Sequence, residues 1–228
     1  MHTVTAPGWT LFGLHRQRGQ VAMNAMGVLA ERQGVVHDFW KPYYRFTGVH
    51  ALCHAHLLRD LTRVIETTHE AWAQRLQTLL VAMHRVAETA RDAEQAEIAA
   101  PVRASYRALY DRYVGQGRLR HPDPEPVPGQ RRRPQRTFPQ NLLRRLGTRP
   151  DEILAFFYDL RIPFDNNAAE RALRMIKVKQ KISGTFRTEE GGTQFGTLRS
   201  DIVTAIQQGL HPLAVLRNAL AGKAWMPE

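Results

Sequence analysis

The spacing of apolar residues changes near residue 50, and this change limits the fold more than any other feature of the sequence. Residues 2–6 and 9–15 are short runs rich in β-branched and aromatic residues with a Pro-Gly turn between them, so they predict a β-hairpin. Residues 18–34 then carry apolar side chains at helical spacing, and residues 34–40 hold another short apolar run. The order strand, strand, helix, strand predicts an α/β arrangement at the start of the chain.

Beyond residue 50 the apolar residues recur at intervals of three and four, which predicts a helix-rich remainder packed as a bundle. Residues 51–114 are expected to be helical, and residues 141–228 return to helical spacing. Between them, residues 115–140 are rich in Pro, Gly and Arg and predict an exposed basic loop, which either meets phosphates or is simply solvated. The expected fold class is therefore α/β, with the strands in residues 1–50 and helices over most of the rest.

The charge balance of the 228-residue chain is strongly basic. Lys plus Arg number 32 against 21 for Asp plus Glu, which points to a polyanionic partner, first nucleic acid and second an anionic membrane. A charge that serves only solubility is the alternative. The single cysteine, Cys53, excludes an internal disulfide framework, and no apolar run suits a membrane span or a signal peptide. We therefore expect a soluble, cytoplasmic protein without a membrane partner.

The segment PFDNNAAERALR at residues 163–174 combines a helix start with an acid on the first helical turn. Asp165, Asn166 and Asn167 are residue types that begin helices. With Asn167 as the N-cap, Glu170 is the third helical residue and can complete a capping box. The same carboxylate can instead hold a divalent metal ion. From this spacing alone, both interpretations stand.

A run of cationic residues follows Glu170, and no acid occurs again before Glu189. Positions 170, 174, 177 and 181 are four, three and four residues apart, so they lie near one helix face. Cations on such a face can hold a DNA backbone by sequence-independent contacts, while the acid at its head holds a metal ion. A solvated helix face is the alternative. The candidate DNA-binding residues are Arg171, Arg174, Lys177, Lys179, Lys181 and Arg187.

Three further residues carry chemical side chains at informative places. Asp38 follows a short apolar run, where an α/β sheet presents functional side chains, although an acid there also serves as a turn residue. Cys53 and His56 have the Cys-x-x-His spacing of half a zinc site. Because the chain has no second cysteine, we expect a packed or hydrogen-bonded role for this pair instead. No glycine-rich phosphate loop or dinucleotide fingerprint occurs, which excludes the common nucleotide-dependent enzymes.

Four stretches together resemble the transposases of the insertion sequence 66 family, which are bacterial DDE enzymes. The stretches are VVHDFWKPYYRF at 35–46, HALCHAHLLRDL at 50–61, PFDNNAAERALRMIKVKQKISGTFRTEEGG at 163–192 and RSDIVTAIQQGLHPLAVLRNAL at 199–220. The resemblance extends from about Met1 to Leu220, and the DNNAAER stretch with its basic continuation is its most specific part.

The resemblance implies a ribonuclease-H-like core with a large helical insertion. Asp38 matches the second catalytic aspartate and Glu170 the catalytic glutamate, as ligands of two Mg²⁺ ions in phosphoryl transfer on DNA. Cys53 and His56 match a Cys-x-x-His signature downstream of the second aspartate. The helices of 51–114 and the basic loop would be the insertion between the two acids. The implied partner is double-stranded DNA, at element ends and target, together with a second copy of the chain or a full-length transposase.

One family feature has no counterpart in the sequence. The family's first aspartate lies on a first strand that precedes the stretch MHTVTA, and this chain has no Asp or Glu before Glu31. The resemblance therefore leads us to expect an N-terminally truncated transposase, with a partial core that lacks its first strand, which binds DNA but is inactive alone. The alternative is a non-catalytic DNA-binding regulator of a full-length transposase.

Overall fold

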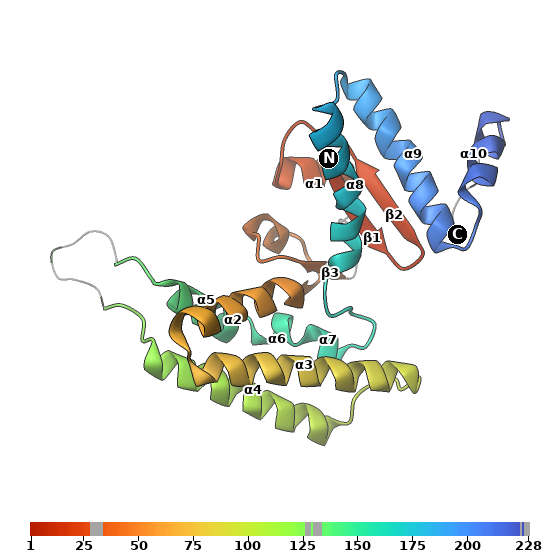
Figure 1. Cartoon of the computed structure of the whole chain (residues 1–228). Helices are drawn as coiled ribbons and strands as arrows, with labels where there is room; N and C mark the ends of the chain where they lie inside the picture. The colour runs from red at the N-terminus through yellow and green to blue at the C-terminus, as the bar shows by residue number, and fades with distance from the viewer. Residues whose placement is uncertain (28–33, 126–128, 130–133, 224, 226–228) are drawn as a thin grey trace. The chain divides into compact units, whose positions relative to one another are not determined.

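The computed structural model in Figure 1 describes residues 1–27, 34–125, 129, 134–223 and 225. The chain forms two compact units. Unit 1 comprises Met1–Arg32, Pro42–Thr47 and Asn167–Glu228, and unit 2 comprises Gln33–Lys41 and Gly48–Asn166. The end of the predicted helix over 18–34, with Glu31, and most of the arginine-rich part of the predicted loop lie outside the described residues.

Unit 1 begins with a β-hairpin. Strands β1 (His2–Ala6) and β2 (Trp9–Gly13) pair antiparallel, with His2 opposite Gly13 at one end. The two-residue turn uses Pro7, whose ring fixes a negative φ, and Gly8, whose φ of +82° most other residues avoid. The predicted hairpin is confirmed. Unit 1 also contains the helices α1 (Gln20–Met26), α8 (Asn167–Ser183), α9 (Glu189–Gln207) and α10 (Pro212–Leu220).

Helix α9 lies beside β2, as Figure 1 shows, and small residues permit this approach. A Cβ added to Gly196 would lie 2.9 Å from the carbonyl oxygen of Phe12, and one added to Gly192 would lie 2.6 Å from a methyl carbon of Leu14. Both distances are shorter than side-chain contacts allow. Glycines spaced by four on α9 therefore bring the helix backbone close to the strand.

Hydroxyl groups of α9 bond to the outer edge of β2. Thr204 Oγ1 accepts from the Thr10 amide at 3.1 Å and donates to the Thr10 carbonyl at 3.2 Å. Ser200 Oγ accepts from the Phe12 amide at 2.9 Å. These side chains satisfy edge groups that would otherwise pair with another strand. Helix α9 begins at Glu189, where Thr188 Oγ1 caps it by accepting from the Gly191 amide at 3.0 Å.

Unit 2 contains a short parallel strand pair. Strand β3 (Gly34–His37) pairs with β4 (Val49–Leu52), with His37 opposite Leu52. Strand β3 matches the predicted apolar run, which confirms the order strand, strand, helix, strand. Strand β4 was not predicted, because four residues including a histidine give no local strand signal and its pairing with β3 is a tertiary contact. A 3-10 helix, η1 (Lys41–Arg45), lies in the connection between the two strands.

The rest of unit 2 is helical and holds most of the buried apolar residues. Its helices are α2 (His54–Thr68), α3 (Ala71–Asp92), α4 (Ala100–Arg120), α5 (Phe138–Thr148), α6 (Pro150–Ile153) and α7 (Ala155–Tyr158). The predicted apolar stripes face inward: Leu61 of α2 and Leu80 of α3 are fully buried. The hydroxyl of Tyr110, also buried, donates to the Leu146 carbonyl at 2.8 Å. The helix-rich α/β fold class is confirmed.

The predicted loop over 115–140 is wrong at both ends. Helix α4 continues to Arg120, and α5 begins at Phe138 after a capping box between Thr137 and Gln140. The glycine read as a loop signal, Gly117, is buried inside α4, where an added Cβ would lie 2.8 Å from the Trp72 ring. Glycine is needed there for close helix packing, not for a turn. The domain boundaries given above stay predictions.

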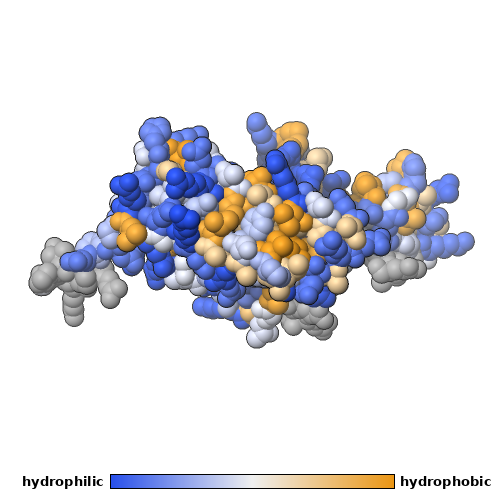
Figure 2. All heavy atoms as spheres, turned by 90° about the horizontal axis from the view of Figure 1, so that it is seen from below, coloured by the Kyte–Doolittle hydropathy of each residue, from blue (hydrophilic) through white to orange (hydrophobic). Residues whose placement is uncertain are grey.

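Figure 2, the face seen from below, shows apolar side chains gathered in its middle, where α3 and α4 lie in Figure 1. Val102 and Leu109 of α4 are among the exposed apolar residues of unit 2. No helix within the described residues has both the length and the apolar character needed to cross a membrane.

Candidate catalytic acids and nucleic-acid interface

Asp38 lies directly after the last residue of β3, at the carboxyl end of a parallel strand. Its side chain is exposed, and its Oδ1 accepts from the Trp40 amide at 3.1 Å. The strand-end position agrees with the sequence analysis, and so does the turn contact that was its alternative. Its catalytic role stays a prediction.

A hydrogen-bonded histidine pair, with His37 buried and His50 half-buried, supports the strand that leads to Asp38. His37 Nδ1 bonds to the Asp38 carbonyl, so Nε2 of the neutral ring accepts from His50 Nδ1 at 3.0 Å. Burial, which disfavours the imidazolium, lowers the pKa of His37 to about 4. The imidazole is therefore neutral near pH 7. Sequence reasoning missed this pair, because only the β3–β4 pairing brings the two rings together.

Cys53 follows β4 and is fully buried at the start of α2. Its Sγ accepts from the Asn166 amide at 3.3 Å and is hydrogen-bonded to His56 Nδ1 at 3.4 Å. Burial raises the pKa of the thiol, so the neutral form is favoured over the thiolate that zinc prefers. Asp165, the neighbour of Asn166, is half-buried and adds a negative charge that raises this pKa further.

Glu170 is exposed on the first turn of α8. The helix begins at Asn167, the residue predicted as the N-cap, so Glu170 is its fourth residue rather than its third. Ala169 and Ile176 are buried and α8 packs against β1, which fixes the face that α8 turns away from solvent within unit 1. The capping contact between Glu170 and Asn167 stays a prediction. Asp38 belongs to unit 2 and Glu170 to unit 1.

The cations after Glu170 fall into two groups. We call Arg171, Arg174, Lys177 and Lys181 the basic stripe; all four are exposed on α8, and Arg187 beyond the helix is exposed too. Lys179 is only half-exposed. Its ammonium nitrogen lies 4.6 Å from the ring centre of Phe186 and 5.6 Å from that of Phe195, which is a cation–π arrangement. Lys179 thus lies over two aromatic rings and is not counted in the basic stripe.

A comparison with models of protein families identifies the family of this chain. Residues 1–194 match the family model of the IS66 transposases. The chain belongs to the IS66 transposase family. No curated protein and no solved structure matches it. The matched part of this transposase includes the hairpin, Asp38, the helices of unit 2 and all of α8. Membership in the family implies DNA transposition and, with it, binding of DNA.

Helix α5 of the transposase contributes an arginine, Arg145, that contacts the residue next to Asp38. Arg145 donates to Asp60 Oδ2 at 2.5 Å, and its guanidinium carbon lies 4.4 Å from the ring centre of Phe39, the residue after Asp38. This contact holds Phe39 in place beside the candidate acid. Sequence reasoning missed it, because Asp60 and Arg145 are 85 residues apart and neither has a local signal.

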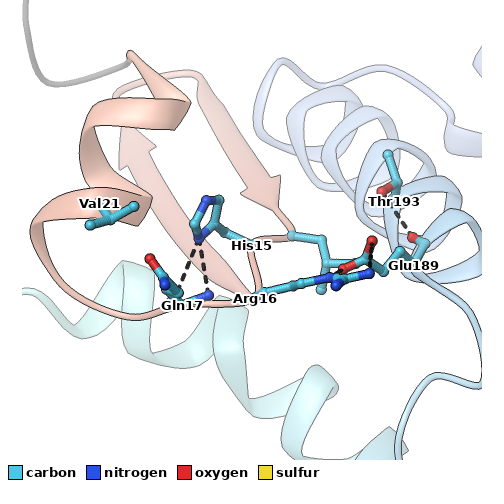
Figure 3. Close-up of a pocket in the computed structure, with 7 residues that line it drawn as sticks. His15, Arg16, Gln17, Val21, Glu189 and Thr193 are labelled. Atoms are coloured by element: carbon cyan, nitrogen blue, oxygen red, sulfur yellow. Dashed lines mark hydrogen bonds and ion pairs between the residues drawn. The ribbon is translucent and has the colours of Figure 1, made fainter.

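Unit 1 of the transposase also has a cavity of about 480 Å³, shown in Figure 3. Its lining residues are Leu14, His15, Arg16, Gln17, Val21, Glu189 and Thr193. Arg16 and Glu189 form a bidentate ion pair, in which Arg16 Nη2 lies 2.9 Å from Glu189 Oε2. The hydrogen bond from Arg16 lowers the pKa of the Glu189 carboxyl. None of the predicted site residues lines this cavity, so it is distinct from the candidate catalytic acids.

Proposed function

We propose that this transposase binds duplex DNA through the basic stripe of α8. We propose further that Asp38 and Glu170 are its catalytic carboxylates in metal-dependent phosphoryl transfer. The observation that carries the proposal is the surface of α8, where an exposed acid on the first turn is followed by four exposed cations and no second acid. A helix surface with four cations and a single acid suits a phosphate backbone, because each cation can replace a condensed counterion.

Lys179 gives the proposal a matched pair of variants on one helix. Lys181→Gln removes an exposed cation of the stripe, whereas Lys179→Gln removes a cation that lies over two rings. We expect Lys181→Gln to lower the slope of log affinity for duplex DNA against log salt by about 1, and Lys179→Gln to leave the slope unchanged. Titrations of labelled duplex DNA at several salt concentrations measure both slopes. Equal slopes for the wild type and Lys181→Gln would argue against the stripe.

The donor atoms of the two acids suit Mg²⁺, which prefers oxygen ligands. Asp38 is exposed; its Oδ2 has no hydrogen bond within the described residues, and Glu170 is exposed on α8. Cys53, in contrast, is a buried neutral thiol. Asp38 and Glu170 would hold Mg²⁺, which supplies charge stabilisation at a phosphate and activates an attacking hydroxyl.

A ribonuclease-H-like core and the insertion belong to the same proposal. The parallel pair β3–β4 with an acid at the carboxyl end of β3 supports this proposal, because such a core has a parallel strand pair of this kind within a larger mixed sheet. Helices α2, α3 and α4 lie in sequence between Asp38 and Glu170, as the proposed insertion would.

Residues 1–228 supply two of the three acids that this chemistry uses, so we propose that they bind DNA without cleaving it by themselves. Supercoiled plasmid incubated with the purified chain and Mg²⁺ or Mn²⁺ is expected to stay intact. Nicking that disappears in Glu170→Gln would contradict inactivity and would support the catalytic role of Glu170. Nicking that persists in Glu170→Gln and Asp38→Asn would contradict both assignments.

A further inference from the structure

The seven residues before α8 form a segment that three side chains hold at alternate positions. We call residues 160–166 the strap; they lie in unit 2, and the strap ends at the residue before α8. It belongs to no helix or strand, so no ladder of backbone hydrogen bonds fixes it. The contacts of these three side chains fall on residues 160, 162, 164 and 166, and the Ile162 amide donates to the Asp159 carbonyl at 3.0 Å to close a turn at the start of the strap.

Arg91 of α3 holds the first half of the strap. Its Nε donates to the Leu160 carbonyl at 2.7 Å and its Nη2 donates to the Ile162 carbonyl at 2.8 Å. No ion pair of Arg91 with an acid occurs among the described residues, and its side chain is partly buried. Burying a cation partly without an acidic partner costs desolvation free energy, and an apolar side chain at this position would pack without that cost. The two backbone contacts are therefore what Arg91 contributes.

His54 holds the third contact point. Its backbone amide and its Nδ1 both donate to the Phe164 carbonyl, at 3.1 Å and 2.9 Å. The Phe164 ring is stacked between two imidazoles, with ring centres 4.2 Å from His54 and 4.0 Å from His84. Phe164 is 8% exposed and His54 is 1% exposed, so the contacts are shielded from water.

Cys53 holds the last contact point, where its Sγ accepts from the Asn166 amide and is also hydrogen-bonded to His56 Nδ1. Asn167 is already the first residue of α8, and Glu170 follows on its first turn. A strap fixed up to Asn166 therefore fixes the backbone from which α8 starts.

We propose that Arg91, His54 and Cys53 are positioning residues that hold the strap, so that α8 starts from a fixed point. The inference rests on the proposed function, in which α8 carries Glu170 and the basic stripe. It also gives the Cys-x-x-His pair a role: His56 is hydrogen-bonded to the sulfur that anchors Asn166, and no metal is needed.

Amide hydrogen exchange of the whole chain tests the proposal without DNA. In the wild type we expect the amides of 160–170 to be protected. In Arg91→Met, which keeps the aliphatic stem but not the donors, we expect these amides to exchange about tenfold faster while the core amides of α2 and α3 stay protected. Arg85→Met, an exposed arginine of the same helix, is the control and should leave the strap unchanged.

The cysteine provides a second pair of variants, in case Arg91→Met disturbs α3. Cys53→Val keeps the size and apolar character of the side chain but cannot accept, whereas Cys53→Ser keeps an acceptor. Faster exchange of the Asn166 amide in Cys53→Val, with protection restored in Cys53→Ser, supports the positioning role. Equal exchange in all variants overturns it.

DNA affinity separates this inference from the proposed function. With both correct, Arg91→Met binds duplex DNA about threefold to tenfold more weakly, because a loosened α8 must be ordered on binding, and its salt slope stays that of the wild type. A wild type that protects the strap but does not bind DNA contradicts the proposed function alone. Normal DNA affinity of an Arg91→Met chain whose strap exchanges faster shows that the strap does not position α8 for DNA.

Discussion

Units 1 and 2 differ in what stabilises them. Unit 2 has fully buried side chains from several helices, such as Leu57, Leu80 and Leu142. Unit 1 has fewer buried residues and leaves apolar side chains in contact with water: Ile182 is 78% exposed and Leu220 is 91% exposed. Unit 2 is therefore stabilised mainly by apolar burial. In unit 1, glycines and hydroxyls on α9 supply the contacts with β2, and unit 1 carries the basic stripe.

The largest expected effect is loss of a buried side chain in unit 2. Leu80→Ala in α3 removes a fully buried side chain, and we expect it to lower the free energy of unfolding by about 2–5 kcal/mol. Leu119→Ala is the control, because Leu119 is 85% exposed and should change stability by less than about 0.5 kcal/mol. Urea unfolding followed by circular dichroism measures both. Similar losses for the two variants would show that unit 2 is not stabilised by its core.

Acid should weaken unit 2 through His54, whose pKa burial lowers to about 3. The folded pKa lies below the ordinary value of 6.5, so the folded state favours the neutral ring. The contribution of neutral His54 to the free energy of unfolding is complete above about pH 6.5 and is lost as the pH falls toward 3. We expect this loss to be on the order of a few kcal/mol. Urea unfolding at pH 7, 5 and 4 should show the loss, and His54→Gln should reduce it. A pH-independent stability over this range would contradict a buried neutral His54.

A smaller effect distinguishes the helical glycines of the two units. In unit 1, Gly196→Ala places a Cβ 2.9 Å from the Phe12 carbonyl oxygen and should destabilise by about 1–3 kcal/mol. In unit 2, Gly115 of α4 has open space around an added Cβ, so Gly115→Ala should stabilise by up to about 1 kcal/mol. Thermal unfolding of the two variants gives opposite signs. The same sign for both would show that α9 does not approach β2 so closely.

The elements that sequence predicted are those with a local period. The alternating hairpin and the helical stripe around Leu80 were found because their apolar spacing is visible within a short window. Strand β4 and the end of α4 were missed, because pairing with β3 and the packing of Gly117 on Trp72 are contacts between distant residues.

In the candidate site, too, the features with a local sequence period were predicted and those that depend on distant contacts were missed. Spacing along α8 predicted that positions 174, 177 and 181 share a face with Glu170, and all are exposed. The same pattern could not separate Lys179, because its partners Phe186 and Phe195 lie beyond the helix and on α9. Nor could it find the strap, since the contacts of Arg91 and Cys53 with it span 69 to 113 residues.

The measurement that tests the account most directly compares neutralised cations on the two units. One variant changes the four residues of the basic stripe to glutamine. Its partner changes four exposed arginines of unit 2 in the same way, namely Arg75, Arg85, Arg112 and Arg120. We predict that the first variant lowers the slope of log affinity for duplex DNA against log salt by about 3 to 4, while the second keeps nearly the wild-type slope. An unchanged slope in the stripe variant, or an equal decrease in both, would contradict the assignment of DNA binding to α8.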